Sequence, residues 1–270
     1  MAYDNFSAPK KALGQNFLQD ANIIRKIVES VGIRADDTIV EIGPGRGALT
    51  DQVLALSNHC HIIEFDRELV SFWQKRAVVS TNLVVHDSDI LKFDMTELLA
   101  QSTRPIKVIG NLPYNISSPV LFHLMQYAEY LDSQTVMLQK EVVDRMVSGP
   151  GSKLYGRLSV MLQQRYRIER LFNVPRTAFF PPPKVESAIV QLTPLSVSDS
   201  SIVLVEDQLL FAKVVKQAFS QRRKTLRNTL KGLLNSEQME SLGIDSKVRA
   251  ETLDVNSFVR LANLLKQVDC

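Results

Sequence analysis

Hydrophobic and polar residues follow two kinds of pattern along the first two thirds of the chain. Short runs rich in valine and isoleucine predict buried strands, and the segments between them carry apolar residues at helical spacing. Alternation of strand and helix is typical of a parallel sheet with helices on both faces. The expected strands are Thr38–Ile42, His61–Phe65, Leu83–Val85, Ile106–Ile109, Thr135–Leu138 and Val185–Leu192, and the expected helices include Ala21–Val31, Ala48–Leu56 and Pro119–Tyr127.

The pattern changes after the last expected strand. Residues 196–201 form a polar stretch that predicts a linker, and beyond it no strand pattern is convincing. Apolar residues there recur at helical spacing, as Leu210 and Val214 do. We therefore expect an α/β domain over residues 1–195 and a small all-α domain over residues 196–270.

The composition allows a sizeable core and does not by itself identify a partner. The chain has 270 residues, of which 45% are hydrophobic, and this length suits one large domain with a smaller one. Lysine and arginine number 32 against 29 acidic residues, giving a net charge of +3. So small an excess does not indicate nucleic acid unless the charge is concentrated locally.

Several absences predict a cytoplasmic protein. The N-terminus lacks the apolar core of a signal peptide, and no run approaches the roughly 18 apolar residues of a membrane span. Cys60 and Cys270 cannot form a disulfide framework, which indicates a reducing compartment. The sequence His59-Cys60-His61 predicts no metal site, because strand alternation points the cysteine away from both histidines.

A strand that runs into a glycine-rich turn is the first candidate binding site. Gly43-x-Gly45-x-Gly47 follows the strand that contains Glu41, and glycines at such a turn let the backbone approach a ligand closely. Ligands of doubly wound folds bind at this edge of the sheet. Glu64, about 20 residues further on, can accept hydrogen bonds from both ribose hydroxyls of a nucleoside. This pattern fits both a dinucleotide-binding fold and the first motif of class I methyltransferases.

Asp89 favours a methyltransferase over a dinucleotide-binding protein. It follows the third strand, where methyltransferases place an acid that accepts a hydrogen bond from the adenine amine of S-adenosylmethionine. The neighbouring Asp87 is expected to be solvated or structural.

The tetrapeptide Asn111-Leu112-Pro113-Tyr114, after the fourth strand, predicts chemistry on the exocyclic amine of adenine. This amine is a poor nucleophile, because its lone pair is delocalised into the ring. The side-chain oxygen of Asn111 and the carbonyl of Leu112 can accept its two hydrogens, which favours a pyramidal nitrogen whose lone pair faces the methyl group. Pro113 fixes the chain, and Tyr114 offers a face on which the base can stack.

With these motifs, the chain closely resembles the small-subunit ribosomal RNA adenine dimethyltransferases, nearly end to end. Lys11–Leu18 is similar to the family's N-terminal signature, Phe179–Ser187 to a later motif, and Gln221–Asn228 to a helix of its second domain. The resemblance implies a class I, Rossmann-like methyltransferase domain that binds S-adenosylmethionine. It places the cofactor at Asn16, Leu18, Gly43, Gly45, Glu64, Asp89 and Asn111, and the catalytic residues at Asn111, Leu112, Pro113, Tyr114 and Phe179, the last as a stacking aromatic.

The resemblance also implies the substrate and partner. Two adjacent adenosines, in a hairpin loop near the 3′ end of 16S rRNA, would each receive two methyl groups at N6 after being unstacked and inserted into the site. The partner would be 16S rRNA within the small ribosomal subunit or its precursor. We expect a monomer that also has a role in subunit biogenesis.

The second domain carries the charge that such a partner requires. Residues 205–235 contain seven basic residues against two acidic ones. If this region were one helix, Lys216, Arg223 and Arg227 would share a face suited to phosphate contacts. The expected RNA-binding residues are Arg222, Arg223, Lys224 and Arg227, and Lys10, Lys11, Arg145, Lys153 and Arg157 could extend the footprint.

Three alternative functions remain open on sequence grounds. An erythromycin-resistance-type methylase shares the chemistry but acts on large-subunit RNA; Leu112, the N-terminal signature and the Arg-Arg-Lys sequence argue against it. An assembly factor without catalysis would bind an immature subunit. A nicotinamide-dependent dehydrogenase is disfavoured by the tetrapeptide and by the lack of a persuasive hydride-transfer constellation.

Overall fold

The chain folds into two compact units. The computed structural model describes residues 8–10, 13–102, 104–196 and 202–268, so the linker residues 197–201 and the signature residues Lys11 and Ala12 lie outside the described residues. The first unit comprises Met1–Val143 and Glu169–Pro194, and the second comprises Asp144–Ile168 and Leu195–Cys270. The division at residue 194 falls next to the expected boundary, but residues 144–168 group with the second unit rather than with residues 1–195. Residues 144–168 group with the second unit because they pack against it. The Tyr155 ring contacts the Phe219 ring edge-to-face, with 6.2 Å between the ring centroids.

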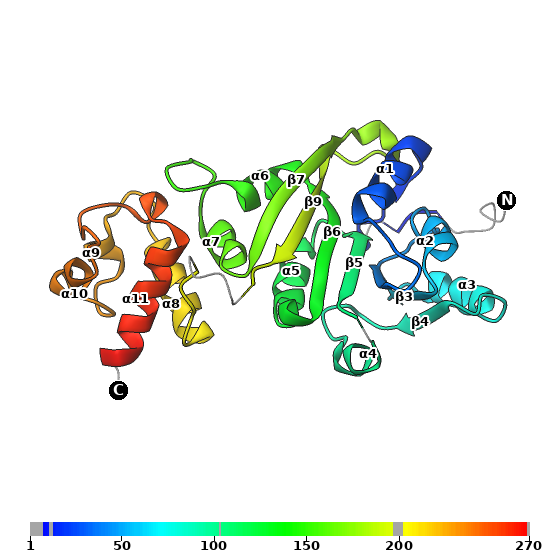
Figure 1. Cartoon of the computed structure of the whole chain (residues 1–270). Coiled ribbons are helices and arrows are strands. Elements are labelled where there is room, and N and C mark those ends of the chain that lie inside the picture. The colour runs from blue at the N-terminus through cyan, green and yellow to red at the C-terminus, as the bar shows by residue number, and fades with distance from the viewer. Residues whose placement is uncertain (1–7, 11–12, 103, 197–201, 269–270) are drawn as a thin grey trace. The chain divides into compact units, whose positions relative to one another are not determined.

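A seven-stranded sheet forms the centre of the first unit, in the order β4-β3-β2-β5-β6-β9-β7 (Figure 1). The pairs β3–β4, β2–β3, β2–β5 and β5–β6 are parallel, whereas β9 runs antiparallel to β6. The predicted mostly parallel α/β fold is therefore confirmed. The strands are β2 (Thr38–Ile42), β3 (His59–Glu64), β4 (Leu83–Asp87), β5 (Ile106–Asn111), β6 (Leu131–Gln139), β7 (Tyr166–Val174) and β9 (Ser187–Pro194).

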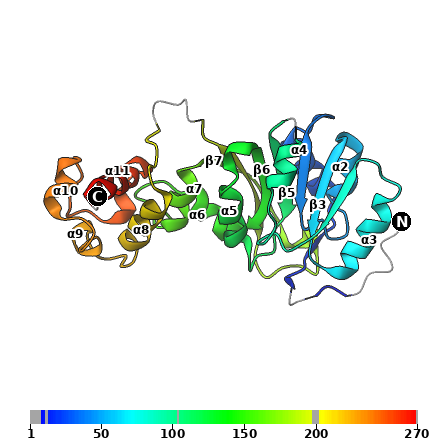
Figure 2. The ribbon, with the colours of Figure 1, turned by 90° about the horizontal axis from the view of Figure 1, so that it is seen from below.

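Helices cover both faces of this sheet, as Figure 2 shows from below. Ile39, Ile109 and Met137 belong to a core cluster that also contains Trp73. Because side chains alternate along a strand, the fully buried Val40 points to the opposite face. The helices of the first unit are α1 (Ala21–Val31), α2 (Thr50–Leu56), α3 (Arg67–Ala77), α4 (Thr96–Gln101), α5 (Ser117–Met125) and α6 (Lys140–Val147), which runs into the second unit, with short 3-10 turns η2 (Ala128–Tyr130) and η3 (Arg176–Ala178).

A second, two-stranded sheet joins the N-terminal segment to the loop before β9. β1 (Phe17–Leu18) pairs antiparallel with β8 (Phe179–Phe180), so that Leu18 lies opposite Phe179 and Phe17 lies opposite Phe180. The N-terminal signature and the later aromatic motif, which are separated by most of the chain, thus meet in space.

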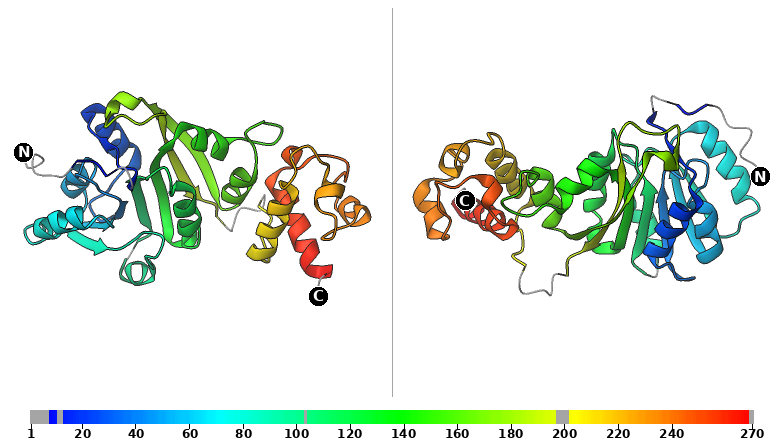
Figure 3. Two further views of the ribbon diagram at one scale, coloured as in Figure 1. Left: turned by 180° about the vertical axis from the view of Figure 1, so that it is seen from behind. Right: turned by 90° about the horizontal axis from the view of Figure 1, so that it is seen from above.

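The second unit contains helices and no strand of its own among the residues after 195 that the structure describes. α8 and α11 pack against each other (yellow and red in Figure 3), and Phe219 stacks on Phe258 at a centroid distance of 5.5 Å. Its helices are α7 (Arg157–Gln163), α8 (Gln208–Ala218), α9 (Leu226–Thr229), α10 (Ser236–Ser241), η4 (Ala250–Thr252) and α11 (Val255–Val268). No helix in the described part of the chain has the length and apolar character to span a membrane.

A stacked histidine pair on β3 and β4 predicts loss of stability in mild acid. His61 Nδ1 lies 3.1 Å from His86 Nε2, and burial lowers the pKa of both, that of His61 to about 4. The unfolded histidine has a pKa near 6.5, so between about pH 6.5 and 4 the unfolded state binds more protons and stability falls as pH falls. We expect His61 to contribute a loss of about 1 kcal/mol from pH 7 to pH 5, after allowance for its partial exposure.

Urea denaturation at pH 7 and pH 5 measures this effect. His61→Gln should flatten the pH profile relative to the unchanged protein, whereas His59→Gln, at an exposed position of the same strand, should change it much less, because the charge of His59 is the smallest of the causes that lower the pKa of His61. Equal profiles for the unchanged protein and His61→Gln would contradict the expectation.

Candidate functional site

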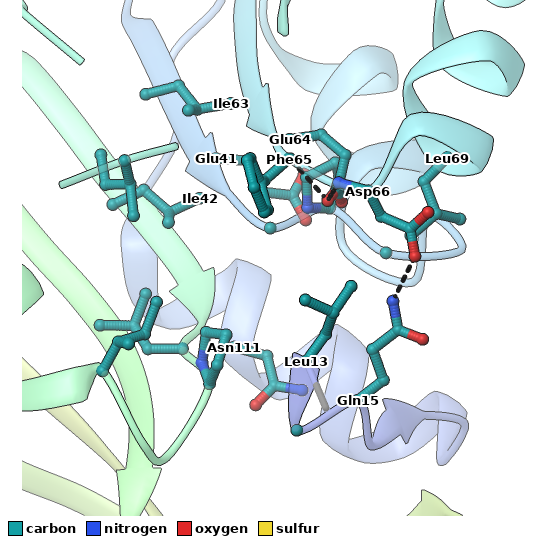
Figure 4. Close-up of a pocket in the computed structure, with 18 of the residues that line it drawn as sticks. Leu13, Gln15, Glu41, Ile42, Ile63, Glu64, Phe65, Asp66, Leu69 and Asn111 are labelled. Atoms are coloured by element: carbon teal, nitrogen blue, oxygen red, sulfur yellow. Dashed lines mark hydrogen bonds between the residues drawn. The ribbon is translucent and has the colours of Figure 1, made fainter. Parts of the chain in front are cut away.

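A cavity of about 270 Å³ opens at the carboxyl ends of β2, β3, β4 and β5 in the first unit. Figure 4 shows how Glu64 and Asn111 approach it from different strands. Parallel neighbouring strands end at the same edge of a sheet, which is why residues far apart in sequence meet here. Ten of the expected site residues line the cavity: Asn16, Leu18, Gly43, Gly45, Glu64, Asp89, Asn111, Leu112, Pro113 and Tyr114.

The glycine turn between β2 and α2 forms one wall of the cavity. The Gly43 amide donates to the Ile63 carbonyl at 2.9 Å, and the Trp73 indole donates to the Gly45 carbonyl at 3.0 Å. Gly47 has φ of +93°, and a Cβ there would lie 2.9 Å from the Trp73 ring. The turn therefore requires glycine both for its backbone conformation and for the close approach of the indole.

Two carboxyl groups reach the cavity from the ends of β3 and β4: Glu64 is the last residue of β3, and Asp89 lies just beyond β4. The Glu64 Oε1 accepts hydrogen bonds from the amides of Phe65 and Asp66, each at 2.8 Å, and burial raises the pKa of Glu64. Asp89 Oδ1 accepts from the Leu91 amide at 3.0 Å. Asp87 is exposed and does not line the cavity, as expected for a solvated neighbour.

Glu41 is a third carboxyl group on the cavity wall, one strand away from Glu64. It is 2% exposed, and the Thr50 hydroxyl donates to its Oε2 at 2.7 Å. Burial, together with the charges of Asp51 and Glu64, raises the pKa of Glu41 to about 8. At neutral pH Glu41 is therefore mostly a neutral acid that can both donate and accept hydrogen bonds.

The tetrapeptide that begins at the last residue of β5 is held at three points. The Asn111 side-chain nitrogen donates to the Asn16 carbonyl at 3.0 Å, which leaves the side-chain oxygen turned away from that contact. The Leu112 amide donates to the Met137 carbonyl at 3.2 Å. The Tyr114 hydroxyl lies 2.6 Å from Ser187 Oγ, and the tyrosine is half-buried at the cavity wall.

Phe179 differs from its expected place. Its side chain is 4% exposed and packs in the core cluster with Leu18 and Ile189, and it is not among the residues that line the cavity. Pairing of β8 with β1 places Phe179 opposite the buried Leu18, whereas Phe180 faces solvent with 51% exposure. The structure therefore brings Tyr114, rather than Phe179, to the cavity.

The N-terminal segment closes the cavity through contacts for which the sequence carries no local signal. Lys10, which was expected to contact RNA, forms an ion pair with Asp66 and a longer one of 3.6 Å with Glu68. Gln15 donates to Asp66 Oδ2 at 2.8 Å, the contact drawn as a dashed line in Figure 4. The Lys10 amine also holds the pKa of Asp66 below its ordinary value, against the effect of burial. Asp66 thus anchors a segment whose residues 13–18 all line the cavity.

Replacing Asp66 with asparagine is expected to weaken cofactor binding without disrupting α3. Asparagine caps helices about as well as aspartate, so the hydrogen bond from the Glu68 amide to residue 66 can persist. The charge that holds Lys10 is lost, and we expect the dissociation constant for S-adenosylmethionine to rise about tenfold, or about 1.4 kcal/mol. Isothermal titration calorimetry tests this, with Glu68→Gln as the matched control; equal affinity of Asp66→Asn and the unchanged protein would contradict it.

The prediction that one helix carries the basic residues of the second unit is wrong. Lys216 lies on α8, but residues 219–225 form turns and α9 begins only at Leu226. The amides of Leu226 and Arg227 donate to the carbonyls of Val248 and Ser246, and the buried Leu226 fixes this turn in the core. Because of these long-range hydrogen bonds, the chain turns after α8 and does not continue as one helix into α9.

The four expected RNA-binding residues are nevertheless all exposed: Arg222, Arg223, Lys224 and Arg227. Arg222 differs from the others because it pairs with Glu251 at 3.4 Å and donates to the Lys153 carbonyl. The Gly151 amide also donates to the Glu251 carbonyl at 2.7 Å. Arg222 therefore fastens the segment before α7 to the helical part of the second unit.

The sheet order, the antiparallel β9 beside β6 and the glycine turn with two carboxyl groups at the strand ends define an S-adenosylmethionine-dependent methyltransferase. Sequence comparison narrows the class, because residues 7–267 match the family described as ribosomal RNA adenine dimethylase. The chain belongs to this family, and its enzymes are S-adenosylmethionine-dependent rRNA dimethyltransferases.

Curated relatives agree with this membership. The chain is 48% identical over 256 residues to ribosomal RNA small subunit methyltransferase A of Pseudomonas putida, covering 95% of this chain and 94% of the relative. It is also 48% identical over 257 residues to the protein of that name from Chromobacterium violaceum, covering 95% of each chain.

Two solved structures share the fold. A dimethyladenosine transferase from Plasmodium falciparum has a TM-score of 0.77 and 28% identity, covering 91% of this chain and 95% of that one. The 23S rRNA methyltransferase ErmE has a TM-score of 0.70 and covers 93% of this chain and 100% of that one, but at 23% identity this likeness shows the fold alone.

Proposed function

We propose that this chain transfers methyl groups from S-adenosylmethionine to N6 of two adjacent adenosines near the 3′ end of 16S rRNA, two to each base. The observation that carries this proposal is the position of Asn111–Tyr114 in the wall of the same cavity as the glycine turn and Glu64. Relatives named small subunit methyltransferase A, matched over nearly their whole length, support the small subunit over the large one.

The donor set of the cavity fits S-adenosylmethionine. Glu64 would accept from the ribose hydroxyls and Asp89 from the adenine amine, because both carboxyl groups reach the cavity from successive strands. Gly43 and Gly45 would lie beside the methionine portion, where a side chain would obstruct the approach of the backbone. Asn16 and Leu18, on the anchored N-terminal segment, would close the cavity over the cofactor.

Catalysis would consist mainly of positioning. When bound, S-adenosylmethionine supplies an electrophilic methyl group on a good leaving group. Asn111 Oδ1 and the Leu112 carbonyl would accept the two N6 hydrogens, and the contact of Asn111 Nδ2 with the Asn16 carbonyl would fix the direction of the acceptor. Tyr114 would support the base by stacking, so that nitrogen, carbon and sulfur lie in line. N6 becomes acidic only once methylated, so its proton needs no strong general base.

The second unit would contribute contacts to RNA phosphates. Arg223, Lys224 and Arg227 are exposed, and contacts of this kind raise affinity without reading sequence. Arg222 would serve chiefly to hold the segment near Lys153 in place. We propose further that the protein acts as a monomer in the cytoplasm, where its 16S rRNA partner is assembled into the small subunit, and that it has a role in subunit biogenesis.

Transfer of labelled methyl groups to small subunits that lack the modification tests the proposal, with the modified bases mapped. N6,N6-dimethyladenosine at two adjacent positions near the 3′ end is the expected result. Labelling of large-subunit RNA would overturn the choice of substrate. Absence of transfer to either RNA by protein that binds the cofactor would instead favour the assembly role alone.

A further inference from the structure

Ser187 is a fully buried residue outside the cavity that contacts the tetrapeptide. It begins β9 and lies opposite Gln139 of β6, and its exposed fraction is 0%. Its Oγ lies 2.6 Å from the hydroxyl oxygen of Tyr114, across 73 positions of sequence. This hydrogen bond ties the loop after β5 to the antiparallel strand β9.

The hydroxyl groups of Tyr114 and Ser187 each rely on the other as a hydrogen-bond partner. A buried hydroxyl without a partner costs free energy, and Tyr114 is the side-chain partner of Ser187 among the described residues. Burial raises the pKa of the Tyr114 phenol, so the group stays protonated and the hydrogen bond persists at neutral pH. The phenolic oxygen lies on the axis of the second side-chain torsion, χ2, so a contact there restricts the first torsion, χ1, and with it the position of the ring.

We propose that Ser187 is a positioning residue for methyl transfer, which fixes the position of the Tyr114 ring on which the target adenine stacks. The inference rests on the proposed function, because it assumes that the base enters beside Tyr114. A ring displaced by rotation about χ1 would move N6 out of the line between the methyl carbon and its leaving group, and small displacements of reacting atoms are costly. The second transfer to each base should suffer more, because the first methyl group occupies part of the room around N6.

The variants Ser187→Ala, Tyr114→Phe and the double substitution test this positioning role. We expect each single variant to lower kcat about tenfold, with unchanged affinity for S-adenosylmethionine, and to raise the ratio of monomethyl to dimethyl product. The double variant should lose no more activity than either single one, because all three remove the same hydrogen bond. Each single variant leaves an unpaired hydroxyl and should lower Tm, whereas the double variant removes both hydroxyls and should regain most of it.

In the double variant, Tm should recover while activity stays low. This combination distinguishes a positioning role of Ser187 from a role in packing alone. Ser57→Ala is the matched control, since Ser57 is a buried serine of the same unit whose hydroxyl bonds the Asp37 carbonyl instead; it should lower Tm and leave the product ratio unchanged. Additive losses in the double variant, or activity that returns with Tm, would overturn the inference while the unchanged enzyme remains active. If the unchanged protein methylates no small-subunit RNA, the proposed function fails and the inference fails with it.

Discussion

Replacing Asn111 with alanine is expected to lower the rate of methyl transfer at saturating cofactor by at least about 100-fold, the usual cost of removing one positioned polar group from a site of this kind. The side-chain oxygen is the proposed acceptor for one N6 hydrogen, and the side-chain nitrogen anchors the amide to the Asn16 carbonyl. Alanine removes both contacts. The chain should remain folded, because residue 111 is the last of β5 and its side chain lies at the cavity rather than in the core.

Asn111→Asp provides the matched comparison. Aspartate keeps an acceptor for the N6 hydrogen but places negative charge against the Asn16 carbonyl, so the loss of rate should be smaller than with alanine while cofactor affinity falls. Single-turnover transfer to small subunits, with calorimetric titration of S-adenosylmethionine for each variant, separates the two effects. A rate within tenfold of the unchanged enzyme for Asn111→Ala would show that Asn111 does not take part in the chemistry. Subunit binding that persists in the inactive variant would assign binding and catalysis to separate parts of the site.

Local patterns in the sequence were sufficient for the fold class and for most of the cavity wall. A run such as Thr38–Ile42 can be buried on both faces only in a covered sheet, and a glycine turn after it marks the ligand-binding edge. Once the strands are parallel, Glu64, Asp89 and Asn111 must come together, because each lies at or just beyond the end of its strand. The structure brings them together for this reason.

The parts that the sequence did not predict depend on contacts between distant segments. The link from Lys10 to Asp66 spans 56 positions, and neither residue carries a local signal for it. Phe179 lies in an aromatic motif, but only the register of β8 against β1 determines that it faces the core and that Phe180 faces solvent. The path after α8 is set by hydrogen bonds to residues 246 and 248. The edge strand β7 was missed because charged residues such as Arg167 and Glu169 interrupt its apolar pattern.

Gly110→Ala is expected to have the second large effect, through the backbone rather than through a lost side chain. Gly110 lies in β5 between Ile42 of β2 and Val136 of β6. A Cβ at this position would lie 2.6 Å from the Ile42 carbonyl oxygen, which is closer than real side-chain carbons approach. Strands pair on both sides, so β5 cannot move away without breaking ladder hydrogen bonds. Overpacking of this kind costs about 1–3 kcal/mol, and more where the clash is with the backbone.

The same displacement should reach the cavity, because the residues after Ile42 and Gly110 are Gly43 and Asn111. We therefore expect Gly110→Ala to lower the free energy of unfolding by about 3 kcal/mol or more and to weaken S-adenosylmethionine binding at least tenfold in the protein that still folds. Gly149→Ala is the matched control, since Gly149 is exposed and a Cβ there meets no atom within 4 Å. Urea denaturation and calorimetric titration measure both effects. An unchanged unfolding midpoint and an unchanged affinity in Gly110→Ala would mean that β2 and β5 can separate freely at the cavity. The close approach of Ile42 would then not explain why glycine precedes Asn111.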